Sequence, residues 1–133
     1  MITSIFINMP IANLKRSVDF FTELGFTFNP QFTSEDTTCM LVGPNIFAML
    51  LERDRFTGFI DKPVADSSSS EVILSLGCES PDEVRKLAEA AFALGARKVN
   101  EIDDKGFMIS WGFEDLDGHL WDLFWMDPKH LEG

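Results

Sequence analysis

Apolar and polar positions along the chain repeat one order of elements twice. An apolar run at residues 4–9 has the character of a β-strand, and Pro10 is expected to end it. Apolar side chains then recur every three to four positions over residues 13–24, which predicts an amphipathic helix. Three further apolar runs predict strands over residues 27–32, 38–42 and 46–52.

The second half of the chain has the same order. An apolar run at residues 71–76 precedes a helical pattern over residues 80–94, and strands are predicted at residues 97–102, 107–113 and 120–126. Each half is therefore predicted to be a βαβββ unit, and a repeat at this scale indicates a duplicated architecture.

Helix and turn signals fix the boundaries of these elements. Gly25 is expected to end the first helix in a left-handed conformation. The second helix is expected to begin at Ser80-Pro81-Asp82-Glu83, which offers an N-cap serine, a proline at the first helical position and a glutamate for a capping box. Asp117-Gly118 is a strong signal for the hairpin between the last two strands.

One domain over residues 1–133 is expected to comprise a first unit at about residues 1–54, a linker at about 55–70 and a second unit at about 71–127. The linker contains Phe56 and Phe59. It is either a passive connection or a lid that these two rings would form.

Composition narrows the possible partners. The chain has 22 acidic and 11 basic residues, and its net charge of −11 without a basic stripe disfavours nucleic acid and anionic membranes. The 13 Phe, 3 Trp and absent Tyr predict either a Phe-rich core or a cavity lined by aromatic rings. No apolar run is long enough to cross a bilayer and no signal peptide is recognised, so a cytoplasmic location is expected.

The cysteines and histidines of the sequence offer little support for a catalytic or metal site. Cys39 and Cys78 form no CxxC pair and are expected to be reduced, small apolar residues. His119 follows the Asp117-Gly118 turn and is expected at the surface, and His130 lies in a polar tail.

Two stretches carry a resemblance to a known family. Residues 13–21, followed by Leu24-Gly25-Phe26, and residues 113–119 (Phe-Glu-Asp-Leu-Asp-Gly-His) resemble motifs of the vicinal-oxygen-chelate superfamily. This superfamily includes glyoxalase, bleomycin-resistance protein and extradiol dioxygenase, and the chain is most similar to an uncharacterised glyoxalase-like branch. The resemblance implies an α+β fold of two tandem βαβββ units with pseudo-twofold symmetry, whose curved, mainly antiparallel sheet encloses a cavity.

The resemblance also implies four positions for metal ligands. They fall on Phe6, on Leu51 or Glu52, on Glu71 and on Asp122. Phenylalanine cannot bind a metal, and transition metals normally need three protein ligands. We therefore expect no transition metal, with a divalent metal held by Glu71, Asp122 and Glu52 as the alternative.

Two carboxylates are the candidate catalytic residues. Asp122 and Glu71 are predicted to share one concave space with Phe6 and Asn8, because alternation places each of them on one face of its strand. Phe6 and Glu71 are expected to occupy equivalent positions of the two units. Burial and mutual repulsion would raise the pKa of one carboxyl toward neutrality and make it a base.

Ligand binding without chemistry is the preferred function. Phe6, Asn8, Trp111 and Phe124 are the predicted ligand-binding residues of a Phe-rich acidic pocket for a small molecule. The alternative is a metal-dependent lyase or isomerase of the glyoxalase I type that uses Glu71 and Asp122. Whether the chain is an enzyme stays open; if it is one, the resemblance implies a lactoylglutathione-lyase-like enzyme or a related oxygenase. A homodimer is also expected, because the strands carry much apolar surface.

Overall fold

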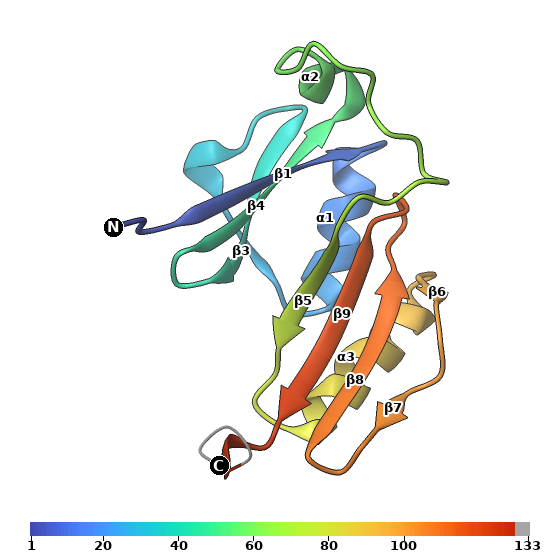
Figure 1. Cartoon of the computed structure of the whole chain (residues 1–133). Helices are drawn as coiled ribbons and strands as arrows, with labels where there is room; N and C mark the ends of the chain where they lie inside the picture. Colours follow the sequence, from blue (N-terminus) through green and yellow to red (C-terminus); the bar gives the residue numbers. More distant parts are fainter. Residues whose placement is uncertain (130–133) are drawn as a thin grey trace. The chain divides into compact units, whose positions relative to one another are not determined.

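The computed structural model describes residues 1–129 and divides the chain into two compact units (Figure 1). Unit 1 is Met1–Ala65 and unit 2 is Asp66–Gly133, so the boundary falls inside the predicted linker of residues 55–70. His130 lies outside the described residues. Each unit has its own sheet and its own helix, and each is described by itself below.

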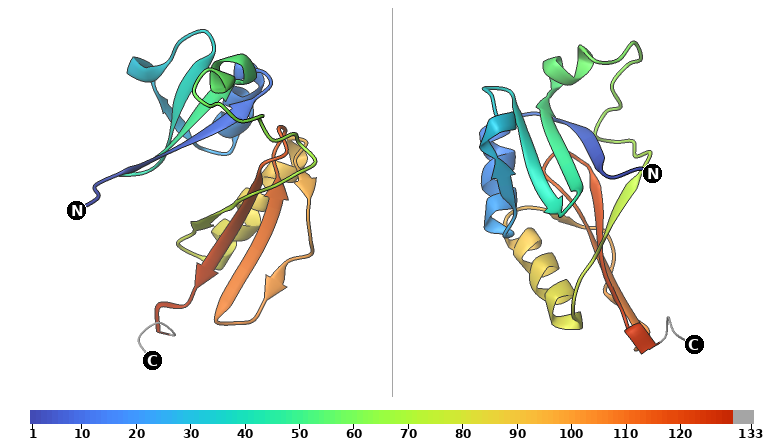
Figure 2. Two further views of the ribbon diagram at one scale, coloured as in Figure 1. Left: turned by 45° about the horizontal axis from the view of Figure 1, so that its top comes forward. Right: turned by 90° about the vertical axis from the view of Figure 1, so that its left-hand side faces the viewer.

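Unit 1 follows the predicted order with two additions. Its elements are β1 (Ile5–Ile11), α1 (Leu14–Glu23), β2 (Thr27–Asn29), the 3-10 helix η1 (Pro30–Phe32), β3 (Thr37–Gly43), β4 (Ile46–Glu52) and α2 (Arg53–Thr57). The strands are ordered β1-β4-β3-β2, with β1 parallel to β4 and the other pairs antiparallel. Helix α1 packs on one face of this sheet (Figure 2).

Unit 2 repeats this topology. Its elements are β5 (Ile73–Gly77), α3 (Pro81–Ala93), β6 (Arg97–Lys98), β7 (Asp103–Asp104), β8 (Met108–Glu114) and β9 (Leu120–Met126). The strand order is β5-β9-β8-β6, β7 also pairs with β8, and β5 is parallel to β9. The predicted α+β class with two βαβββ units is confirmed, as two separate mixed sheets of four and five strands.

Both long helices end as predicted. Gly25 and Gly95 follow the two helices with φ of 102° and 104°, a conformation that residues with a Cβ rarely adopt. The amide after each glycine donates to the carbonyl five residues before it, at 3.0 Å in both units. The two repeats therefore share one helix-ending motif.

The helix starts are also close to the prediction. The Ser80 hydroxyl accepts a hydrogen bond from the Glu83 amide at 3.1 Å. The Glu83 carboxylate bonds the amide of Glu79 at 2.8 Å, one residue before the position that a standard capping box uses. Asn13 caps α1 by accepting from the Arg16 amide at 2.9 Å.

Most of each core lies between one helix and one face of its sheet, although Cys39 and Leu51 are buried on the other face of the first sheet. The buried apolar residues of unit 1 are Met9, Ile11, Phe20, Phe21, Leu24, Cys39, Met40, Ala48, Leu50 and Leu51. Those of unit 2 are Val84, Ala88, Ala91, Ala96, Ile109, Phe113, Trp121 and Leu123. Among the described residues, no helix is long and apolar enough to cross a membrane.

Two predicted strand boundaries in unit 1 are wrong. β1 continues through Pro10 to Ile11. It is an edge strand of its sheet, and an edge tolerates a residue without an amide hydrogen. The strand predicted over residues 27–32 ends at Asn29, whose side chain accepts from the Gln31 amide at 2.9 Å and starts the 3-10 turn.

Two boundaries in unit 2 also differ. β5 begins at Ile73 rather than at residue 71, because residues 66–70 form a turn in which the Ser69 amide donates to the Asp66 carbonyl at 3.2 Å. The strand predicted over residues 97–102 is only β6. The Asn100 carbonyl accepts from the Trp111 indole at 3.0 Å, and the chain resumes pairing at β7.

The predicted linker contains a helix that the sequence analysis missed. α2 is five residues long, with Asp54 in its first turn and Arg55 in its last, which suits the helix dipole. Phe56 is half-buried, whereas Phe59 is 68% exposed and has the Arg55 guanidinium over its ring.

Candidate functional site

Alternation along the strands gives each sheet a face toward its helix and a face away from it, which we call the distal face. In unit 2, Trp121 and Leu123 are buried on the side of α3, so Asp122 and Phe124 belong to the distal face. Figure 1 shows β5, β9 and β8 side by side in front of α3. The register places these residues together in the middle of the distal face of unit 2: Ser75, Asp122 and Gly112 in one row, and Gly77, Phe124 and Ser110 in the next.

Asp122 is the most unusual residue of this face. It is half-buried, and within the described residues its carboxylate makes no hydrogen bond or ion pair. Burial raises the pKa of the Asp122 carboxyl above its ordinary value. A carboxylate that is partly removed from water and has no partner is costly for the folded protein, and it is available to a ligand.

Glu71 does not lie beside Asp122. The strand neighbour of Asp122 on β5 is Ser75, and Glu71 is an exposed residue before the strand begins. Glu71 precedes Ser75 by four residues and lies in a bend outside the strand. The predicted acid–base pair is therefore not assembled within unit 2.

The register also separates Glu71 from Phe6. Ile5 starts its parallel pairing opposite Ile46, and Ile73 starts the matching pairing opposite Leu120. The equivalent of Phe6 must share its distal face, and at the start of β5 that residue is Ile73 rather than Glu71, because Leu74 pairs with Trp121 on the side of α3. The predicted repeat is therefore out of register by two residues, because residue 71 lies outside the strand.

Trp111 lies on the opposite face from Asp122. Its ring meets that of Phe92, on α3, edge to face at 5.2 Å between centroids, and Lys98 lies over it at 5.6 Å. These contacts make it part of the core beside α3. Phe124, in contrast, is on the distal face, where a Cβ added to Gly77 would lie 3.3 Å from its ring.

In unit 1, Phe6 and Asn8 share the distal face. Phe6 is 47% exposed and stacks on Phe47, with 4.5 Å between ring centroids and 18° between ring planes. Asn8 is opposite Met49 on β4 and is exposed. The pairing also places Thr27, Asn29 and Thr37 on this face, and none of its strand residues is charged.

The strand register shows on which face of the sheet Leu51 and Glu52 each lie. Leu51 pairs with Pro10, two positions from Asn8, and so lies on the distal face. Glu52 lies on the side of α1, where its carboxylate accepts a hydrogen bond from the Leu14 amide at 2.9 Å. Glu52 thus binds the positive end of the α1 dipole.

The side chains present do not fit the metal site that the family implies. The first position holds the stacked ring of Phe6, and Glu52 is used at the start of α1. Asp122 is flanked by Ser75 and Gly112, neither of which is a usual metal ligand. No group of three or more His, Cys, Asp or Glu side chains within residues 1–129 is arranged to hold a metal ion.

The remaining candidate nucleophiles are not activated. Cys39 is buried, and Cys78 has a pKa raised to about 11 by burial and by the nearby negative charges of Glu83 and Asp122. A thiol with a raised pKa stays protonated near neutrality and is a poor nucleophile. His119 is half-buried in the hairpin turn, where its amide donates to Asp115 at 3.0 Å.

Asp115 is a buried carboxylate that the sequence analysis did not single out. One of its oxygens accepts from the amides of Asp117 and His119 at 2.9 and 3.0 Å, and the other accepts from the Trp121 indole at 2.8 Å. Burial raises its pKa, although these hydrogen bonds act in the opposite direction. The sequence signal was an aspartate two residues before Asp117-Gly118, which is typical of a side chain that closes a turn. Its role is structural.

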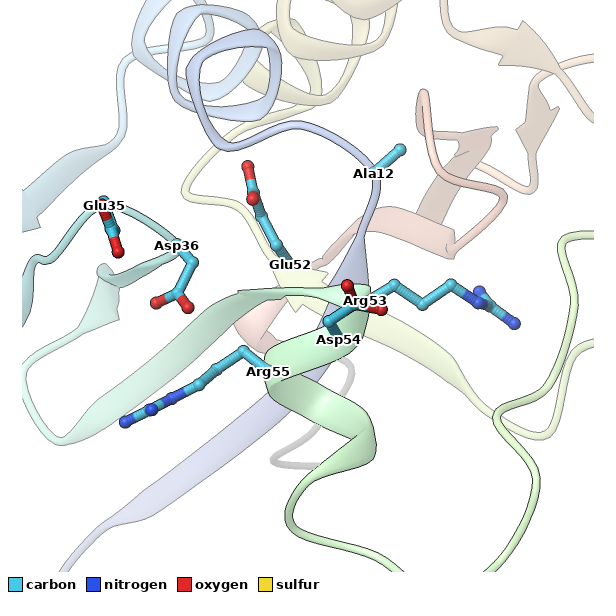
Figure 3. Close-up of a pocket in the computed structure, with 7 residues that line it drawn as sticks. All are labelled: Ala12, Glu35, Asp36, Glu52, Arg53, Asp54 and Arg55. Carbon is cyan, nitrogen blue, oxygen red and sulfur yellow. The ribbon is translucent and has the colours of Figure 1, made fainter.

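A hollow of about 440 Å³ lies at the start of α2 in unit 1 (Figure 3). It is lined by Ala12, Glu35, Asp36, Glu52, Arg53, Asp54 and Arg55. Of the predicted site residues it contains only Glu52, which is bound to α1. Hydrogen bonds from Thr37 and Ser34 lower the pKa of Asp36. The hollow therefore has charged walls. Two of its carboxylates, those of Glu52 and Asp36, already accept hydrogen bonds.

Comparison with known proteins agrees with this fold. Residues 3–43 match the family described as "Bleomycin resistance protein-like N-terminal". No curated protein matches the chain. A hypothetical protein from S. aureus has a similar structure, with a TM-score of 0.79 and 27% identity over 93% of this chain and 94% of that one.

Two further solved structures carry functional descriptions. A glyoxalase-related enzyme from Fulvimarina pelagi matches with a TM-score of 0.78 and 20% identity, over 90% of this chain and 85% of that one. The fosfomycin resistance protein FosX from Mesorhizobium loti matches with a TM-score of 0.71 and 14% identity over the whole of both chains. At these identities the likeness concerns the fold alone.

Proposed function

From the premise that this chain has the fold of the glyoxalase and bleomycin-resistance proteins, in the vicinal-oxygen-chelate superfamily, we propose that it binds a small cationic molecule. The binding residues would be Asp122 and Phe124, on the distal face of unit 2. The observation that carries the proposal is the half-buried Asp122 carboxylate, which has no partner among the described residues.

The chemistry of the face supports a cation. A ligand nitrogen would supply the positive charge that Asp122 lacks, and the neighbouring Phe124 ring would contact its apolar part. Unit 2 also has 15 acidic and 6 basic residues, so its field attracts cations. Phe6 and Phe47 on unit 1 offer a separate aromatic surface that suits a ring-containing ligand.

The metal-dependent lyase or isomerase that uses Glu71 and Asp122 has less support. Glu71 lies before β5, and Glu52 is bound to the start of α1. We therefore propose binding without a transition metal and assign no reaction step to these carboxylates.

A homodimer remains part of the proposal. Large apolar side chains are exposed along the edge strands β1 and β5, among them Ile5, Phe6 and Ile73 at 53%, 47% and 63%. Such surface is typical of an interface. Light scattering at micromolar concentration should give twice the mass of one chain, and a monomer would contradict this part. The two free thiols suit the cytoplasmic location expected from the sequence.

The test is a titration with benzylammonium and its neutral isostere benzyl alcohol. Wild-type protein should bind the cation more tightly than the alcohol. Asp122→Asn should weaken cation binding at least tenfold, because the amide keeps the shape of the side chain and removes its charge. Glu89→Gln removes an exposed charge on α3, on the other side of the sheet, and should change the affinity less than twofold.

Two outcomes would count against the proposal. Equal affinity of Asp122→Asn and wild type for benzylammonium would remove Asp122 from the site. An equal loss in Glu71→Gln and Asp122→Asn would restore the paired-carboxylate alternative, because Glu71 should not contribute if the register of β5 is right.

A further inference from the structure

The strands of unit 2 carry three carboxylates on the distal face, and two of these have a cationic partner. Glu114 is opposite Arg97 on β6, and the Arg97 guanidinium donates to both oxygens of the Glu114 carboxylate, at 3.1 and 3.3 Å. Asp103, on β7, lies 3.4 Å from the Lys105 ammonium group. Asp122 has no such partner among the described residues, so it carries the uncompensated charge of this face.

Glu114 is the paired carboxylate closest to Asp122 in the sheet. The register places Gly112 opposite Asp122 and Glu114 two residues further along β8, so Glu114 is the diagonal neighbour of Asp122 on the same face. Diagonal neighbours on adjacent strands are about 7 to 8 Å apart. Asp103 lies beyond β8, on the next strand, and is therefore more distant. A single ligand of modest size could reach both Asp122 and Glu114.

The ion pair that occupies Glu114 is accessible to solvent. The Arg97 side chain is 60% exposed and the Glu114 side chain is 26% exposed. An ammonium group would therefore meet the Glu114 carboxylate from the open side of the sheet. It would have to displace the guanidinium, because the guanidinium already bonds both carboxylate oxygens in the paired geometry that arginine favours.

We propose that Arg97 is a specificity-determining residue of the Asp122 site and that, by occupying Glu114, it limits the site to ligands with one ammonium group. The inference rests on the proposed function, which places a cation at Asp122. With Arg97 in place, two carboxylates and one guanidinium leave a single negative charge, which one ammonium group neutralises. Without Arg97, two neighbouring carboxylates would attract a diammonium ligand.

The test compares benzylammonium with m-xylylenediammonium, which carries a second ammonium group on the same ring, in NMR titrations of the full-length, ¹⁵N-labelled chain. Wild-type protein should bind the two probes with affinities within threefold of each other. Arg97→Gln should bind the diammonium probe at least tenfold more tightly than wild type does, because the released Glu114 carboxylate takes the second ammonium group. Its affinity for benzylammonium should change less than threefold.

Two control variants separate the loss of this ion pair from a change in net charge. Lys98→Gln removes the same charge from the next residue of β6, whose side chain lies over the Trp111 ring, on the other face, and pairs with Glu101. It should change either affinity less than threefold. The double variant Arg97→Gln/Glu114→Gln should lose the gain, because it lacks the carboxylate that Arg97→Gln releases. The Arg97–Glu114 pair is at the surface, so the amide spectra of these variants should show the wild-type fold.

The outcomes separate this inference from the proposed function. If Asp122→Asn weakens binding of both probes but Arg97→Gln binds the diammonium probe no better than wild type does, Arg97 does not set the specificity and the cation site stands. An equal gain in Lys98→Gln, or a gain that persists in the double variant, would also overturn the inference. If wild-type protein binds neither probe at millimolar concentration, both proposals fail. A gain confined to Arg97→Gln supports the inference.

Discussion

The two units have one topology and different chemistry. Both have a first strand parallel to the last, a helix on one face and the same glycine-ended helix. Unit 1 nevertheless has a formal net charge of −2 and unit 2 one of −9. The helix-facing sides are apolar in both, so the packing that specifies the fold is shared.

The difference is concentrated on the distal faces. A central row of unit 1 holds Asn8, Met49 and Cys39, whereas the matching row of unit 2 holds Ser75, Asp122 and Gly112. The apolar Met49 of one repeat is thus matched by the charged Asp122 of the other. The fold places its long helix on one face of each sheet, which leaves the other face free to differ and to carry function.

The largest effect should come from the hairpins, which the two units build differently. Unit 2 closes the β8–β9 turn on the buried Asp115, while unit 1 joins β3 to β4 through Pro44 and Asn45. Asp115→Ala should lower the free energy of unfolding by about 3 kcal/mol, since two amides and the Trp121 indole lose their acceptor. Chemical denaturation measures this.

The control is Glu114→Ala, one residue earlier. Glu114 pairs with Arg97 at 3.1 Å on the surface, and an exposed ion pair contributes about 0.5 kcal/mol. Similar losses in the two variants would show that Asp115 is not the centre of the turn.

A smaller effect on stability is expected from the Glu52 carboxylate of unit 1. Glu52→Ala should lower the free energy of unfolding by about 1 kcal/mol, because the Leu14 amide at the start of α1 loses its acceptor. Binding of benzylammonium should not change. Glu35→Ala, an exposed neighbour in the same hollow, should leave stability nearly unchanged. A loss of binding in Glu52→Ala would contradict the assignment of the site to unit 2.

The effect of Asp122→Asn on the free energy of unfolding should have the opposite sign and the smallest magnitude. It removes a half-buried charge without a partner, so the free energy of unfolding at pH 7 should rise by roughly 0.5 to 1 kcal/mol. Asp122→Asn would thus weaken ligand binding while it raises stability, whereas Asp115→Ala and Glu52→Ala should lower stability. A calorimetric melting temperature below that of wild type would contradict this.

The pH dependence of stability follows from the direction of the shift. Burial raises the pKa of Asp122 in the folded protein above the ordinary 3.8, so the folded state holds this proton more tightly than the unfolded state. The contribution of Asp122 to stability is therefore present below pH 3.8 and is lost as the pH rises through the folded-state pKa. The stability difference between Asp122→Asn and wild type should grow over that range.

Sequence patterns predicted the elements that depend on local signals. The two helices, their caps and the strand at residues 120–126 were found because capping residues, glycines and apolar periodicity lie next to one another in the chain. The fold that the resemblance implies is likewise shared by the solved structures that this chain resembles.

The site was harder to predict because it depends on register. Trp111 was expected near Phe124, but one residue of alternation places it on the side of α3 instead. Glu71 was expected in a strand that begins two residues later. The strand partners of Asp122 are Ser75 and Gly112, which attract no attention in the sequence and become informative only when β5, β9 and β8 are paired.

The central claim is that the unpaired Asp122 carboxylate binds the cationic group of a ligand. The pKa of Asp122 tests this claim most directly. Carboxyl ¹³C NMR should give a pKa for Asp122 above 3.8 in the ligand-free protein. Saturating benzylammonium should lower it, because a bound positive charge favours the ionised form. A ligand-free pKa at or below 3.8, or a raised value that does not move when the cation is added, would contradict the account.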